Sequence, residues 1–154
     1  MLRPALQKVK LRSLYNQFIG VEVVVDKGEN AFNILLWMPN LTKFYLVDIN
    51  SMEAAKHKLK DYKEKTEFIN LPSVKASKRF DDNSLNFVYI DAEHTYEAVT
   101  ADMNAWYPKV TTGGMLCGHD YGSYLPEVVR AVDDYCKANN LNPTVEENDW
   151  MVIK

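Results

Sequence analysis

The sequence predicts an α/β protein with a seven-stranded, mostly parallel sheet, helices on both faces and a C-terminal β-hairpin. Three observations lead to this prediction. Short apolar runs rich in β-branched and aromatic residues recur along the chain. Longer amphipathic segments separate the first five of them, which is typical of parallel strands joined by helical crossovers. The last two runs have no helical segment between them, which indicates a hairpin.

The strands are expected where an apolar run is bounded by turn residues. The first run, at residues 18–25, is rich in valine without polar alternation, which favours a strand buried on both faces. Asn148 and Asp149 are expected to form the turn of the terminal hairpin. The seven expected strands are residues 18–25, 44–48, 67–70, 85–91, 115–118, 143–146 and 150–153.

The helices are expected between residues that suit helix ends. Ser51 is a good N-cap for the second helix, and Pro39 and Pro108 stop the first and the fourth. Residues 81–84 are expected to form a turn, as is Gly113-Gly114 before the fifth strand. The five expected helices are residues 28–37, 52–62, 72–79, 96–106 and 125–138.

Length and composition favour a single globular domain over residues 1–154. The chain is 47% apolar and 25% charged, which is ordinary for such a domain. Residues 1–17 are expected to be a helical or irregular extension before the first strand. The lysine-rich run at residues 56–65 is interleaved with acidic residues, so we interpret it as the solvent-exposed face of a helix.

Charge and cysteine content exclude several classes of partner. A net charge of −3 disfavours nucleic-acid and membrane binding. No apolar run approaches the ~18 residues of a membrane span, and no secretory leader precedes the first strand. Cys117 and Cys136 lie outside any CxxC pair. We therefore expect a reduced, cytoplasmic protein.

Polar residues follow the predicted strands at the edge where an open α/β sheet binds ligands. A single polar residue there is commonly a helix cap, but a set of acids and histidines from several strands favours a functional site. Asp48 ends the second strand, Asp91 and His94 follow the fourth, and His119 and Asp120 follow the fifth.

Asp48 is the clearest individual signal in this set. An acid at the end of the second strand, about 20 residues after a glycine-bearing turn, can accept the hydroxyls of an adenosine ribose. This geometry serves NAD and S-adenosylmethionine (SAM) alike. The first turn, from Gly20 to Gly28, lacks the GxGxxG spacing that binds a pyrophosphate, and SAM carries no phosphate.

Four segments resemble the class I SAM-dependent methyltransferases of methyltransferase family 24. That family is similar to cephalosporin-hydroxylase-like and macrocin-type O-methyltransferases and, more distantly, to the catechol type. The resemblance runs from about Phe18 to the C-terminus and implies a Rossmann-like fold. The segments are residues 21–31 (VEVVVDKGENA), 45–48 (YLVD), 88–98 (VYIDAEHTYEA) and 113–121 (GGMLCGHDY).

The resemblance implies roles in cofactor binding for six residues. Glu22 is expected to face the methionine end of SAM, and Gly28 to allow close approach of the backbone. Asp48 is expected to hold the ribose, Ile49 to lie against the adenine and Ser73 to touch its edge. Asp91, at the end of the fourth strand, is expected in the same site.

The resemblance to metal-dependent relatives also implies a cation site and a base. Asp91, His119 and Asp120 are the expected metal ligands. Oxygen ligands suit Mg²⁺, and an imidazole among them shifts the preference towards Mn²⁺. His94, three residues after Asp91, occupies the place of the catalytic base in the catechol type, and imidazole can accept a hydroxyl proton near neutral pH.

Val24 departs from the family signature, which has glycine at this position of Glu-x-Gly. A β-branched residue there removes space and disfavours positive φ, so the loop is reshaped, SAM binds weakly, or SAM does not bind. The leading hypothesis is methyl transfer to a small-molecule hydroxyl, assisted by a divalent metal. The second is a degenerate binding or assembly module, and the third is a metal-dependent hydrolase or oxygenase. Because only about 17 residues precede the first strand, we expect either that a partner subunit, as in a homo-oligomer, supplies acceptor recognition or that the acceptor site is open.

Overall fold

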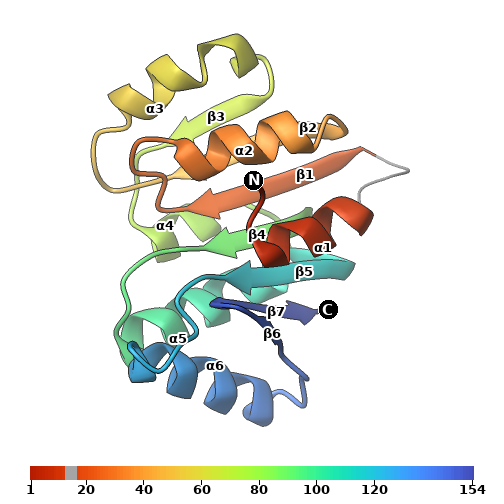
Figure 1. Ribbon diagram of the computed structural model, residues 1–154, viewed down its shortest axis with the longest axis vertical. Coiled ribbons are helices and arrows are strands. Elements are labelled where there is room, and N and C mark those ends of the chain that lie inside the picture. The colour runs from red at the N-terminus through yellow and green to blue at the C-terminus, as the bar shows by residue number, and fades with distance from the viewer. Residues whose placement is uncertain (13–16) are drawn as a thin grey trace.

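The computed structural model describes residues 1–12 and 17–154, and its seven strands form one sheet (Figure 1). The strand order is β3-β2-β1-β4-β5-β7-β6. β1 to β5 are parallel, and β7 is antiparallel to both of its neighbours, which confirms the predicted fold class. The strands are β1 (Phe18–Val23), β2 (Leu41–Val47), β3 (Thr66–Ile69), β4 (Leu85–Ile90), β5 (Val110–Gly118), β6 (Thr144–Glu146) and β7 (Asp149–Ile153).

Helices cover both faces of the sheet (Figure 1). Residues of α1, α2 and α3 belong to one hydrophobic cluster, and residues of α4, α5 and α6 to the other. β4 contributes Phe87 and Tyr89 to the first cluster and Val88 and Ile90 to the second. Burial on both faces explains why the parallel strands are continuously apolar. The helices are α1 (Pro4–Arg12), α2 (Glu29–Trp37), α3 (Glu53–Lys58), α4 (Ser73–Ser77), α5 (Tyr96–Trp106) and α6 (Pro126–Ala138), with short 3₁₀ turns η1 (Lys60–Tyr62) and η2 (Tyr107–Lys109).

The N-terminal extension, predicted over residues 1–17, contains helix α1. Leu6 and Val9 of this helix are buried in the first cluster, and residues 13–16 lie outside the described part of the chain. None of the helices within residues 1–12 and 17–154 is long and apolar enough to cross a membrane.

Several strand boundaries differ from the prediction by one to five residues, among them those of β1 and β5. β1 ends at Val23, because Val24 takes a left-handed conformation with φ of 67° that leaves the strand. Gly113 and Gly114 lie inside β5 and do not precede it. The pairing of β4 with β5 shifts register after Leu85, and Gly113 has φ of 79°, so the glycines accommodate an irregularity within the strand.

Two predicted end residues were wrong. Ser51 does not cap α3, since Met52 occupies the N-cap position and no side chain caps the helix. The hairpin turn uses Glu147 and Asn148, with Glu147 in the left-handed region at φ of 55°. Asp149 is therefore the first residue of β7 and is buried, a placement that Asp149 owes to contacts far away in sequence.

The carboxyl ends of four neighbouring parallel strands meet at one edge of the sheet. Val23 at the end of β1 pairs with Val47 of β2 and with Ile90 of β4, and Ile90 pairs with Gly118 of β5. The residues that follow these strand ends therefore lie close together, as the sequence predicts for a ligand-binding edge.

Candidate functional site

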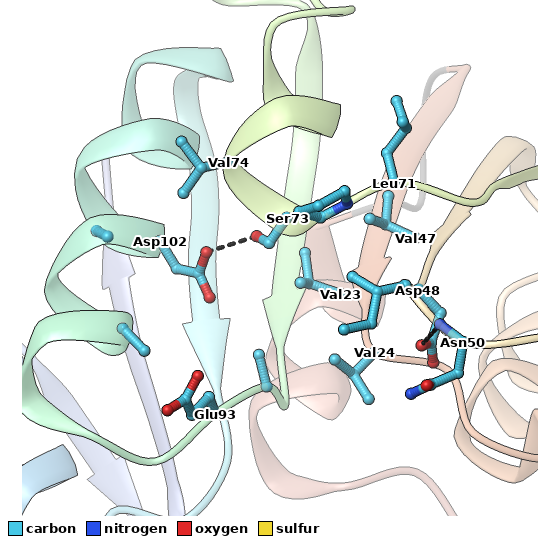
Figure 2. Close-up of a pocket in the computed structure, with 15 residues that line it drawn as sticks. Val23, Val24, Val47, Asp48, Asn50, Leu71, Ser73, Val74, Glu93 and Asp102 are labelled. Carbon is cyan, nitrogen blue, oxygen red and sulfur yellow. Dashed lines mark hydrogen bonds between the residues drawn. The ribbon is translucent and has the colours of Figure 1, made fainter.

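A cavity of about 330 Å³ opens at this edge, between the ends of β1 and β2 and the helices α4 and α5 (Figure 2). Its walls are mostly aliphatic, with polar groups at a few positions. Such a composition is typical of small-molecule sites, where apolar walls supply contact area and a few polar groups orient the ligand. The lining residues are Val23, Val24, Val47, Asp48, Ile49, Asn50, Leu71, Pro72, Ser73, Val74, Ala92, Glu93, Ala98, Ala101 and Asp102.

Asp48 fixes the first turn and lines the cavity. Its Oδ2 accepts hydrogen bonds from the backbone N–H groups of Val25 (3.0 Å) and Asp26 (3.2 Å). Its Oδ1 accepts the N–H of Asn50 at 2.8 Å. A carboxylate offers about four acceptor positions, so these bonds leave capacity for about one ligand hydroxyl. Asp48 is 3% exposed, and these three bonds hold its carboxylate in one orientation.

Val24 keeps the backbone conformation that favours glycine. Its φ is 67°, and its N–H donates to the carbonyl oxygen of Val47 at 2.8 Å. The turn has therefore not moved away to make room for the side chain. Val24 lines the cavity and lies at the same end of it as Asp48 and Asn50 (Figure 2). The isopropyl group therefore forms part of the cavity wall at this end.

Glu22 is a buried acid in the middle of the sheet, 2% exposed. Its Oε1 accepts a hydrogen bond from Asn30 Nδ2 at 2.7 Å, and its Oε2 is buried without a hydrogen-bond partner. Burial raises the pKa of Glu22 to about 8, and the neighbouring charge of Asp91 adds to the rise, while the Asn30 hydrogen bond opposes it. An orphaned buried acceptor of this kind is costly unless a donor completes it.

Asp91, His94 and Asp120 bring one potential ligand atom each to within 4.8 Å of the others. The His94 Nε2 to Asp120 Oδ2 distance is 2.7 Å. Burial opposes ionisation of Asp120, but the charges of His119 and His94 and hydrogen bonds from Tyr124 and His119 lower its pKa below the ordinary value. Asp120 is therefore a stable anion that can orient an imidazole or help to hold a cation.

His119 stands outside this group of three. Its Nδ1 lies 2.9 Å from Asp120 Oδ1, so it contacts the other oxygen of the carboxylate that His94 contacts. This arrangement suits a residue that orients Asp120.

Arg3 is a site residue that the sequence analysis missed. Its guanidinium Nη1 lies 2.7 Å from Asp91 Oδ2 and donates to the Tyr89 hydroxyl at 2.9 Å. No local motif marks Arg3, since it lies just before α1 and 88 residues from Asp91. A cation held on Asp91 competes with a metal ion for the same oxygen.

Three further residues were expected to contact the cofactor. Ile49 and Ser73 line the cavity, and Gly28 does not. Gly28 is the N-cap of α2 with φ of 80°, and a Cβ there would lie 3.0 Å from that of Ala55, so glycine is needed for packing against α3. Ile49 lies at the cavity with 65% of its surface exposed. Ser73 lines the cavity, but its hydroxyl donates to Asp102 Oδ1 at 2.5 Å (Figure 2). Asp102 was not singled out in the sequence analysis.

Comparison with known proteins gives a family model and similar folds. A model described as a methyltransferase domain matches residues 21–121. Protein R132 of Acanthamoeba polyphaga mimivirus, itself uncharacterized, is 36% identical over 53 residues; the match covers 33% of this chain and 24% of that protein.

Solved structures share the fold at low identity. SMU.1697c from Streptococcus mutans was solved in complex with S-adenosylhomocysteine (SAH). It has a TM-score of 0.76 at 13% identity, with 100% of this chain and 99% of that chain covered. The O-methyltransferase NovP has a TM-score of 0.72 at 17% identity, with 97% of this chain and 79% of that chain covered. These likenesses concern the arrangement of strands and helices.

Proposed function

The chain belongs to the family of methyltransferase domains whose model matches it, a family whose cofactor is SAM, and from this premise we propose that it transfers the methyl group of SAM to a hydroxyl of a small-molecule acceptor. The observation that carries the proposal is the cavity at the carboxyl edge of the sheet, where the acceptor Asp48 adjoins apolar walls. An adenosine needs this combination of a hydroxyl acceptor and a flat apolar slot.

The cavity residues suit the adenosine part of SAM better than the methionine part. Asp48 retains capacity for about one ribose hydroxyl, and Val47, Leu71 and Ala98 offer apolar surface to the purine. Glu22 does not line the cavity, and its unpartnered Oε2 is buried, so the amino group of the methionine part would reach it only after a shift of the first turn. Val24 forms part of the cavity wall at the Asp48 end. The residues at the ribose and purine end therefore fit SAM, and Val24 is the lining side chain expected to weaken binding.

The acceptor hydroxyl would be deprotonated by His94. SAM supplies an electrophilic methyl group when bound, so the task of the chain is to align the acceptor oxygen and to remove its proton. Asp120 Oδ2, 2.7 Å from His94 Nε2, orients the ring and stabilises the imidazolium that forms. His119, in contact with Asp120 Oδ1, holds the carboxylate in place.

Calorimetric titration with SAM and with SAH tests the proposal. We expect weak binding by the unmodified chain and at least tenfold tighter binding by Val24→Gly, because glycine accepts φ of 67° and removes the isopropyl group from the cavity. Asn140→Gly is the matched control, since Asn140 also has positive φ, at 54°, and does not line the cavity. This control should leave the affinity unchanged.

The absence of binding by both the unmodified chain and Val24→Gly would contradict the proposal. A degenerate binding or assembly module would then be the better interpretation, which the Val24 side chain in the cavity already favours as the second candidate.

Assistance by a divalent metal is a separate part of the proposal. Where a metal binds, the carboxylates of Asp91 and Asp120 with the imidazole of His94 would form a mixed oxygen and nitrogen set that suits Mn²⁺ better than Mg²⁺, and His94 would then act as a ligand in place of its role as the base. A bound metal would acidify the acceptor hydroxyl. Because Arg3 occupies Asp91 Oδ2, we expect Arg3→Ala to bind Mn²⁺ more tightly than the unmodified chain.

The affinity for Mn²⁺ is measured by titration, with free Mn²⁺ monitored by electron paramagnetic resonance. Asp120→Asn should lose the metal, whereas Lys8→Ala, which removes an exposed ion pair of α1 with Glu146, should not change the affinity. Equal affinity in Arg3→Ala and Asp120→Asn would remove the metal from the mechanism and leave His94 as a metal-independent base. Metal binding without SAM binding would instead favour a hydrolase or oxygenase.

A further inference from the structure

We propose that Asp102 recognises the 6-amino group of adenine and makes the cavity selective for adenine over 6-oxopurines. The proposal rests on the proposed function, because it concerns the nucleoside part of the same cavity. It assigns to Asp102, on α5, a role in specificity, and it turns Ser73 from a ligand contact into a positioning residue.

A chain of hydrogen bonds fixes the Asp102 carboxyl. The Trp106 indole Nε1 donates to Ser73 Oγ at 2.8 Å, and Ser73 Oγ donates to Asp102 Oδ1 at 2.5 Å. The hydroxyl proton of Ser73 is thus committed to Asp102 and is not offered to a ligand. Trp106 is fully buried, so the chain starts from a rigid donor. Asp102 Oδ2 remains as the oxygen with capacity to accept from the cavity (Figure 2).

Asp102 is buried without a compensating charge. It is 5% exposed, and within residues 1–12 and 17–154 the Ser73 hydroxyl is its hydrogen-bond partner and no cation pairs with it. Burial raises the pKa of Asp102 to about 6, the Ser73 hydrogen bond opposes this rise, and the charge of Glu93 adds to it. A carboxyl group in this position destabilises the fold unless a ligand supplies a donor, which is a mark of a binding residue.

The cavity around Asp102 suits a flat ring with a donor at its edge. Val47, Leu71, Val74 and Ala101 line it with aliphatic surface. Adenine presents an exocyclic amine with two N–H donors, one of which Asp102 Oδ2 can accept. Hypoxanthine presents a carbonyl oxygen at the same position, so two acceptors would face each other at a carboxyl group that is only 5% exposed. Sites built to hydrogen-bond one partner reject such an analogue strongly.

The substitution Asp102→Asn predicts a reversal, not merely a loss. Ser73 would continue to donate to the amide oxygen of the new side chain, which takes the place of Oδ1. The amide NH₂ would then occupy the position of Oδ2 and offer donors to the cavity. A donor at this position repels the adenine amine and matches the carbonyl oxygen of hypoxanthine. A residue with only a structural role would not change the preference between the two bases.

The experiment is calorimetric titration of the unmodified chain, Asp102→Asn and Glu97→Gln with four ligands: SAH, S-inosylhomocysteine, adenosine and inosine. We expect the unmodified chain to prefer each adenine compound at least tenfold, and Asp102→Asn to lose or reverse the preference. Glu97 is an exposed acid on the same helix and does not line the cavity, so Glu97→Gln should keep the preference. Thermal melting establishes that each variant is folded.

The four ligands separate this inference from the proposed function. SAH binding with no preference over S-inosylhomocysteine, or an unchanged preference in folded Asp102→Asn, would overturn the role of Asp102 while the methyltransferase proposal stands. Selective binding of adenosine with no binding of SAH would support the role of Asp102 and overturn methyl transfer. Binding of none of the four ligands would overturn both.

Discussion

Glu22 and Asp102 are buried acids whose cost to stability a bound ligand would offset. Glu22 lies in β1 and Asp102 in α5, both are at most 5% exposed, and burial raises the pKa of each. A core position would be more stable with an apolar residue. Val24 is the backbone counterpart of these two acids. A valine at φ of 67° is strained, so this residue too costs stability at the site.

The raised pKa of Glu22 predicts a specific pH dependence of stability. Its folded pKa of about 8 exceeds the ordinary value of 4.5, so between these values the folded state binds more protons than the unfolded state. The contribution of Glu22 to stability is therefore complete at low pH and is lost as the pH rises through about 8. Asp91, Arg3 and Asp48 are the charged groups that act on it.

Urea denaturation of the unmodified chain and of Glu22→Gln at pH 5.5, 7 and 8.5 measures this dependence. The neutral variant should gain on the unmodified chain as the pH rises, because glutamine can accept from Asn30 without ionising. If the difference in free energy of unfolding between the two proteins does not change with pH, the carboxyl of Glu22 does not titrate in this range.

Gly28 supports a second prediction at the scale of one residue. Gly28→Ala should destabilise the chain by about 1–3 kcal/mol, because φ of 80° strains an alanine and the new Cβ would press on Ala55. Urea denaturation gives the value, and Gly113→Ala is the control. Gly113 has a similar φ of 79° but open space around its Cβ, so it isolates the backbone strain from the packing effect.

At the scale of elements, helix α5 connects the loop of the expected base and metal ligands with the cavity that Asp102 lines. It begins directly after the loop that carries Asp91 and His94, and it carries Asp102. Thr95 is its N-cap, and the Thr95 side chain accepts a hydrogen bond from the N–H of Ala98. Its predicted bounds of 96–106 are confirmed, because a capping residue and Pro108 mark the ends locally.

Thr95→Ala should therefore cost about 1 kcal/mol in the free energy of unfolding. Thr95→Ser keeps the capping oxygen and should stay within about 0.5 kcal/mol of the unmodified chain. Equal losses in both variants would mean that the threonine methyl group, and not the hydrogen bond to Ala98, stabilises the start of α5.

At the scale of the whole molecule, Asp149 joins the two ends of the chain. Its Oδ2 accepts the N–H of Ala5 in the first turn of α1 at 2.9 Å, and its Oδ1 accepts the Tyr89 hydroxyl of β4 at 3.0 Å. Arg3 extends this connection from Tyr89 to Asp91. The position of α1 thus depends on the terminal hairpin. The position of Arg3 beside Asp91 depends on it as well.

Asp149→Ala should destabilise the chain by about 2–4 kcal/mol, because it leaves two buried donors without a partner. Hydrogen exchange should rise in α1 more than in α2. Asp133→Ala is the matched control, since Asp133 also accepts a tyrosine hydroxyl, that of Tyr121, but at an exposed position. A loss no larger than that of the control would show that α1 does not depend on Asp149.

The sequence by itself determined the sheet, its hairpin and the edge that carries the site. Apolar runs and amphipathic segments record burial on two faces, and burial is a local property that a sequence carries at every position. The same pattern put Asp48, Asp91, His94 and Asp120 at strand ends. Their convergence then follows from parallel pairing, as Val23, Ile90 and Gly118 show.

Only the tertiary structure decided which partner each polar group meets. Arg3 reaches Asp91 across 88 positions, Ser73 reaches Asp102 across 29, and Asp149 reaches Ala5 across 144. No local pattern encodes these pairs, because a hydrogen bond depends on distance and direction in space and not on neighbours in sequence. For the same reason the sequence could show that Val24 replaces a glycine, but only the backbone could show that the turn kept the conformation that favours glycine.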